Sequence, residues 1–124
     1  MIFFVSVGCL AAIVHWGTVV ALVSGLAWHP LVANVAGWLL AFTVSFSGHH
    51  LGSFRGHGAP PLAAARRFFV VSALGFVVNE IAYAMLLRWS GQSFELVLAL
   101  LLVAVAGLTY LASRHWAFLS SAGR

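Results

Sequence analysis

Four long runs of apolar residues, separated by three shorter polar stretches, make up most of the chain. The runs cover residues 2–25, 31–47, 68–87 and 94–111. About 20 consecutive apolar residues cross a hydrocarbon core of about 30 Å as an α-helix, and the second run is only just long enough. Open strands in lipid could not satisfy their backbone groups, so each run should be helical. The pattern predicts an all-α membrane protein, with four transmembrane helices forming one domain over residues 1–124.

The polar stretches predict how the helices are connected. Tight turns are expected at 28–30, Trp-His-Pro, and at 90–93, Ser-Gly-Gln-Ser. Residues 48–67 are rich in glycine and proline and predict a longer extramembrane loop. The chain should therefore form two helical hairpins, each entering the membrane in the same direction.

The arginines predict the orientation of these hairpins. Five of the six lie in the loop or beyond the last run: Arg55, Arg66, Arg67, Arg114 and Arg124. The other side has Arg88 alone. Because positive residues collect on the cytoplasmic side, both termini and the loop are expected in the cytoplasm. The first run lacks a basic start and exceeds a signal-peptide core, so we expect it to be retained; its small residues leave cleavage as the alternative.

Composition narrows the function classes. The chain is 63% hydrophobic, and 6% of its residues are charged, against about a quarter in soluble domains. Its net charge of +4 rests on arginines placed by topology, so no nucleic-acid partner is expected. The chain has no Asp and no Lys, although phosphoryl transfer and metal-dependent sugar-nucleotide chemistry usually hold their ion with Asp. We expect no enzyme and no cofactor.

Histidines near the loop raise the question of a metal site. His49, His50 and His57 have no cysteine close by, whereas structural zinc normally takes four ligands that commonly include cysteine. A solvated loop is the favoured interpretation, and no metal is expected. A catalytic triad is disfavoured as well, because neither Glu80 nor Glu95 accompanies a recognisable nucleophile motif.

Glu80 lies near the middle of the third run, where an ionised carboxylate costs about 2.5–3.5 kcal/mol on insertion scales. His15 occupies the corresponding depth of the first run, and a hydrogen bond or ion pair between the two would lower that cost. Asn79 and Asn34 add polar groups to the interior. We predict a midplane polar site of His15, Asn79 and Glu80 that lines a head-group path or relays a proton. The alternative is a purely structural tie between helices.

Small residues recur every fourth position in the first hairpin. The expected seams are Gly17, Ala21 and Gly25 in the first helix, and Ala33, Gly37, Ala41 and Ser45 in the second. Such seams let helices approach closely in lipid, although Gly and Ala are also simply common there.

A weak internal repeat carries a resemblance to a known family. Phe-Phe-Val at residues 3–5 recurs at 68–70, and the closing segment at 50–54 has its counterpart at 114–118. With Gly8 and the Ala33-Asn34 pair, these motifs resemble those of the GtrA-like family of small four-span membrane proteins over nearly the whole chain. His50 stands where the family commonly has Arg.

The resemblance implies a role in polysaccharide or glycolipid assembly in the bacterial inner membrane. The protein would translocate, or assist translocation of, a polyprenyl-phosphate-linked sugar, often beside a glycosyltransferase. Basic side chains at the cytoplasmic membrane surface suit lipid phosphates. The candidate phosphate-binding residues are Arg66, Arg67, Arg114, His50 and Asn34. For the arginines, topology alone is the competing explanation.

Two other functions stay open. One is a small proton-coupled transporter resembling small multidrug resistance proteins, although there the key glutamate lies in the first span and here it is in the third. The other is a scaffold subunit that positions a membrane glycosyltransferase. Because four short spans enclose little volume, a homodimer surrounded by membrane lipids is expected.

Overall fold

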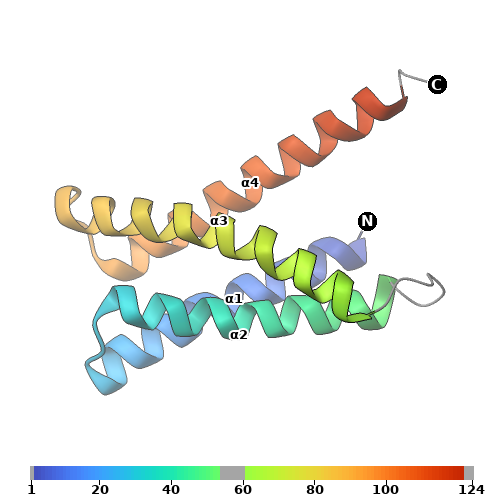
Figure 1. Cartoon of the computed structure of the whole chain (residues 1–124). Helices are drawn as coiled ribbons and strands as arrows, with labels where there is room; N and C mark the ends of the chain where they lie inside the picture. The colour runs from blue at the N-terminus through green and yellow to red at the C-terminus, as the bar shows by residue number, and fades with distance from the viewer. Residues whose placement is uncertain (1, 54–60, 122–124) are drawn as a thin grey trace.

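The computed structural model describes residues 2–53 and 61–121, and within them the backbone alone at residues 4, 49–53, 61, 63–65, 68, 109–110 and 112–121. The described part is four α-helices (Figure 1): α1 Ile2–Leu26, α2 Pro30–Ser53, α3 Pro61–Trp89 and α4 Phe94–Ser121. The predicted all-α fold of four helices is confirmed. Val5–Leu26, Pro30–Gly48 and Phe69–Trp89 are long and apolar enough to cross a membrane, and α4 contributes the shorter apolar stretch Phe94–Leu108.

Helix ends extend beyond the apolar runs around the central connection. The predicted loop at 48–67 is too long, because α2 continues to Ser53 and α3 already begins at Pro61. Helix propagation adds one hydrogen bond per residue whether or not the side chain is apolar, and proline suits the first helical turn. Hydropathy therefore located the membrane-crossing parts and missed the helical extensions. Arg55 and His57 lie outside the described residues.

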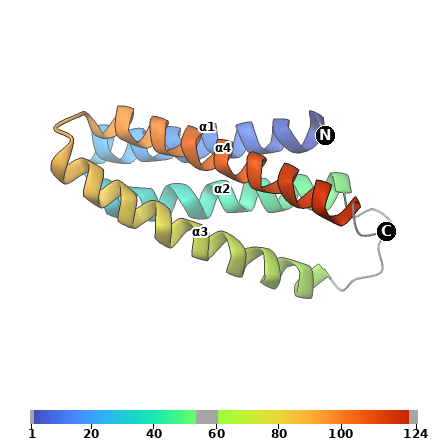
Figure 2. The same ribbon diagram turned by 90° about the horizontal axis from the view of Figure 1, so that it is seen from above.

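The four helices lie close together at one end of the bundle, and α3 and α4 spread apart toward the other end (Figures 1 and 2). We call these the turn end, with the α1–α2 and α3–α4 turns, and the termini end. The α1–α2 pair is packed most extensively, and α3 lies against both α2 and α4. Near the turn end, Val19, Ala33, Tyr83, Val97 and Leu98 bring all four helices into one buried cluster. The bundle is thus tightest near the turn end.

The α1–α2 interface uses only one of the two predicted small-residue seams. Ala33, Gly37 and Ala41 of α2 are buried, as predicted. In α1 the prediction is wrong: Ala21 is exposed, and Gly17 and Gly25 face open space. The buried face of α1 instead carries Val7, Ala11, His15 and Val19. Both faces of α1 are apolar, so small residues alone did not identify the packed one.

Gly37→Ala is expected to destabilise the protein by about 1–3 kcal/mol, the usual cost of overpacking. An added Cβ would stand 2.8 Å from His15 Cδ2 and 2.9 Å from the His15 carbonyl oxygen, and that backbone atom cannot move cheaply. Unfolding in detergent measures the loss. Gly17→Ala is the matched control, because its Cβ meets nothing within 4 Å and alanine favours the helix. Equal stability of the two variants would contradict the close α1–α2 contact.

Candidate functional site

A buried hydrogen-bond network joins α1, α2 and α3 inside the bundle. At its centre, Asn34 of α2 accepts a bond from His15 Nε2 of α1, at 2.7 Å from Asn34 Oδ1. Its Nδ2 donates to Asn79 Oδ1 at 3.1 Å and to Glu80 Oε2 at 2.9 Å, both on α3. His15, Asn34 and Asn79 are buried, and Glu80 is half-buried. The side chains of His15 and Glu80 are thus connected through an amide between them.

The depth of the network follows from the candidate spans. His15 lies at the centre of Val5–Leu26, and Asn79 and Glu80 lie at the centre of Phe69–Trp89. Asn34 lies in the first turns of α2, close to the turn end. The side chain of Asn34, near the start of α2, therefore bonds residues that lie in the middle of α1 and α3.

The bonding pattern fixes where the hydrogens lie. Asn34 Oδ1 can only accept, so His15 Nε2 must carry a hydrogen. Both hydrogens of the Asn34 amide are used by Asn79 and Glu80. In a neutral His15 ring, Nδ1 is then an acceptor. The Asn34 amide has no hydrogen left to donate, and the ionisable groups of the network are His15 and Glu80.

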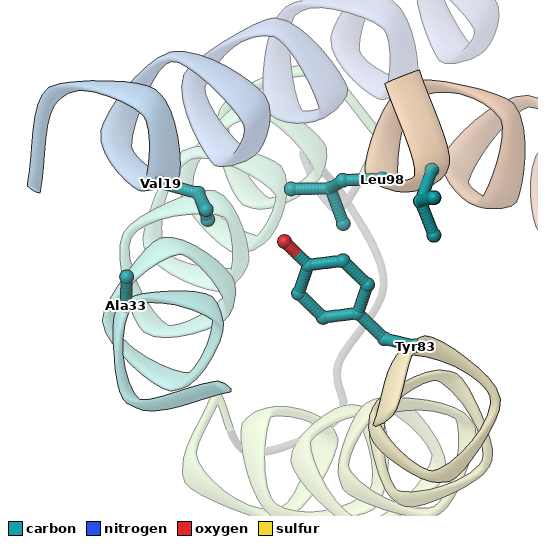
Figure 3. Close-up of a cluster of buried hydrophobic side chains, with 5 residues drawn as sticks. Val19, Ala33, Tyr83 and Leu98 are labelled. Atoms are coloured by element: carbon teal, nitrogen blue, oxygen red, sulfur yellow. The ribbon is translucent and has the colours of Figure 1, made fainter. Parts of the chain in front are cut away.

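Two buried polar atoms on α3 lack a hydrogen-bond partner: Glu80 Oε1 and the Tyr83 hydroxyl oxygen. Tyr83 is completely buried, and Figure 3 shows its hydroxyl pointing toward Val19 of α1 and Leu98 of α4. Glu80 and Tyr83 lie three residues apart and so occupy neighbouring positions on one helix face. The free oxygen leaves Glu80 with capacity for another donor.

Tyr83→Phe is expected to stabilise the protein by about 1 kcal/mol, because a buried hydroxyl without a partner costs free energy and the ring packing is kept. Unfolding in detergent, compared with the native protein, measures the change. Tyr83→Leu serves as the control that removes the ring and should destabilise the cluster. A loss of stability in Tyr83→Phe would show that the hydroxyl has a partner.

A partly open pocket of about 190 Å³ lies beside His15, on the side of that residue that faces the termini end. Its lining combines small and polar groups with two aromatic rings: Ala11, Ala12, His15, Trp38, Ala41, Phe42, Ser45 and Ser72. The indole N–H of Trp38 donates to Ser72 Oγ at 2.9 Å. We call this space the His15 pocket. It gives the network an approach from one side of the bundle.

Aromatic rings of α2 and α3 hold the wall of the His15 pocket. Trp38 stacks on Phe76, with ring centroids 4.7 Å apart, and lies 5.6 Å from Phe69. Phe42 meets Phe69 edge to face at 5.3 Å. Such ring pairs add about 0.5–1.5 kcal/mol each beyond their burial. The aromatic contacts keep α2 and α3 together on the side of the network toward the termini end, where α4 leads away from α3.

The predicted phosphate-binding residues do not form one group. Asn34 belongs to the buried network and not to a basic cluster. Arg66 and Arg67 are exposed in the first turns of α3. The backbone places His50 in α2 and Arg114 in α4, and their side chains lie outside the described residues. Among the residues that the structure describes, no three His, Cys, Asp or Glu side chains gather as metal ligands.

Comparison with known proteins identifies the family. The family model described as "GtrA/DPMS, transmembrane domain" matches residues 3–118. The chain belongs to this family. No curated protein and no solved structure matches it. As a GtrA/DPMS-family domain, the chain is an integral membrane protein of processes that use lipid-linked sugars.

For this GtrA/DPMS-family chain, sequence reasoning found the polar residues and missed how they connect. His15 and Glu80 were expected to meet directly, and the structure places Asn34 between them. Tyr83 and the lining residues Trp38 and Ser72 were not singled out. A tyrosine one turn beyond an intramembrane glutamate was a usable signal, since its hydroxyl must also find a partner in lipid.

Proposed function

We propose that this protein translocates, or assists translocation of, a polyprenyl-phosphate-linked sugar across the bacterial inner membrane, without catalysing a covalent step. The observation that carries the proposal is the buried network of His15, Asn34, Asn79 and Glu80 at the foot of a pocket. Polar and ionisable side chains inside a lipid-spanning bundle are rare and usually mark a substrate path or a proton relay. A sugar head group with many hydroxyls is such a cargo.

The chemistry of the His15 pocket supports a hydroxyl-rich head group. His15, Ser45 and Ser72 offer hydrogen-bonding groups, while Trp38 and Phe42 offer apolar faces. A pocket of about 190 Å³ admits only a small group, so the prenyl chain would stay in the surrounding lipid. With the termini end in the cytoplasm, as the arginines predict, the pocket would receive its cargo from the side on which Arg66 and Arg67 lie.

The free oxygen of Glu80 and the pocket beside the network bear on the two competing functions, a proton-coupled transporter and a scaffold. A proton-coupled transporter would use Glu80 as its proton site, and the free Oε1 suits that role. A scaffold for a glycosyltransferase would need the network only to hold helices together. The open pocket beside the network favours translocation, because a structural tie needs no open space next to it. We propose two copies side by side, so that their pockets together line the head-group path.

The test uses the full chain reconstituted in vesicles. Polyprenyl-phosphate sugar labelled in the sugar is placed in one leaflet, and an impermeant oxidant that reacts with sugar diols reports its arrival in the other. Faster appearance with the protein than in protein-free vesicles is expected. Proton release on addition of a cationic drug, with no sugar movement, would support the drug-transporter alternative. Sugar movement only when a glycosyltransferase is present would support the scaffold.

A further inference from the structure

A second pocket lies at the turn end, on the opposite side of the network from the His15 pocket. It has a volume of about 370 Å³ and is lined by His29, Pro30, Leu31, Ala84, Leu87 and Arg88. The first three residues lead into α2, and the last three belong to the final turns of α3. The buried cluster around Tyr83 and the network of Asn34 separate the two pockets along the bundle. The proposed path of the head group through the His15 pocket does not include this second pocket.

His29 lines this pocket, and one of its two ring nitrogens already accepts a hydrogen bond. The Leu31 N–H donates to His29 Nδ1 at 3.2 Å, and the His29 carbonyl accepts the first helical bond from Ala33 N at 3.0 Å. Because Nδ1 accepts, a neutral ring must carry its proton on Nε2. His29 therefore presents an N–H without needing a positive charge.

Arg88 provides a positive charge at this pocket. It is exposed in the last turn of α3 and lines the pocket beside His29. A guanidinium offers paired N–H donors that match phosphate oxygens. Arg67 lies 21 positions earlier on the same helix, which corresponds to about 32 Å along the axis, close to the thickness of a hydrocarbon core. Helix α3 thus carries a phosphate-matching side chain at each membrane surface.

We propose that the pocket of His29 and Arg88 binds a phosphate group at the turn end and receives the head group after it has crossed the bundle. The inference rests on the proposed function, since it supplies a second phosphate site for the same cargo. Without it, a lipid phosphate leaving Arg66 and Arg67 would find no positive partner on the far side among the described side chains, because Arg88 is the one arginine there.

The experiment maps phosphate contacts on the full chain in phosphatidylcholine nanodiscs. The probe is a polyprenyl monophosphate with a diazirine on the isoprenyl unit next to the phosphate, and mass spectrometry locates the cross-links. We expect cross-links both near Arg66 and Arg67 and at the pocket of His29 and Arg88. Arg88→Gln should reduce the turn-end cross-links about fivefold, the effect of losing one charge beside an anionic head group. Arg88→Lys is the matched control: it keeps the positive charge and should retain most of the turn-end cross-links.

Competition then identifies the source of the phosphate. Loss of turn-end cross-links with unlabelled polyprenyl monophosphate, but not with polyprenol, supports a lipid head group. Equal loss with inorganic phosphate supports a site for free phosphate. Turn-end cross-linking that is unchanged in Arg88→Gln overturns the site, even where the vesicle assay shows sugar movement. Conversely, Arg88-dependent cross-links without sugar movement would retain the site and overturn the proposed function.

Discussion

Glu80→Gln is expected to reduce sugar translocation by about tenfold to a hundredfold while leaving the fold intact. The glutamine carbonyl can still accept the bond that Asn34 Nδ2 donates, so the network keeps its shape. What is lost is the ionisable group whose second oxygen is free for a donor from the cargo. Leaving a buried polar group without its hydrogen-bond partner costs roughly 1–3 kcal/mol, which sets the size of the effect. Initial rates in the vesicle assay measure it.

Glu95→Gln is the matched control for this substitution. Glu95 is the chain's other acid and lies in the first turn of α4, where it does not belong to the network. It should translocate at close to the native rate. Full activity of Glu80→Gln at normal expression would remove the midplane site from the mechanism and leave it a structural tie.

Asn34→Leu is expected to destabilise the protein by about 2–5 kcal/mol. Asn34 makes three side-chain hydrogen bonds, and bonds between membrane helices contribute about 0.6 kcal/mol on average and up to about 1.7 kcal/mol each. Leucine has a similar size, so the loss reports hydrogen bonding more than packing. It also leaves His15, Asn79 and Glu80 without this partner inside the bundle. The free energy of unfolding in mixed detergent micelles measures the effect.

Asn79→Leu is the matched control, because it removes a buried amide that makes one bond of the network instead of three. Asn79 is also buried and accepts one of the three bonds, so its replacement should cost about one third as much. If Asn34→Leu and Asn79→Leu lower the stability equally, Asn34 does not link His15 to Glu80 in the way described. A larger loss for Asn34→Leu supports its central position.

The sequence predicted the fold to a large extent because a lipid environment leaves few choices. Hydropathy located the spans, and the ends of the predicted first and third spans lie within a few residues of those in the structure. It could not locate where α2 ends and α3 begins, because helical hydrogen bonding continues past the apolar residues. The two turns were also recognisable: Ala27 closes α1 in the left-handed region with φ 55°, and Gly91 has φ 67° in the second turn.

The site was predicted in its members more than in its connections. Position along the chain placed His15 and Glu80 at the centre of their spans. The cost of burying a carboxylate in lipid indicated Glu80 as a candidate functional residue. Asn34 was expected to add a polar group to the interior and was also grouped with the arginines, and its position between His15 and Glu80 was not predicted. A one-dimensional pattern gives depth along a helix and not the direction in which a side chain points.

By itself, then, the sequence determined that the chain is helical, that it lies in a membrane, and how far along their spans Glu80 and His15 lie. The tertiary structure decided which faces pack, and so placed Asn34 between His15 and Glu80 and opened a pocket on each side of the network. The physical reason is that these helices are apolar on nearly every face. Helix rotation is then set by close packing at residues such as Gly37 and by polar groups finding one another.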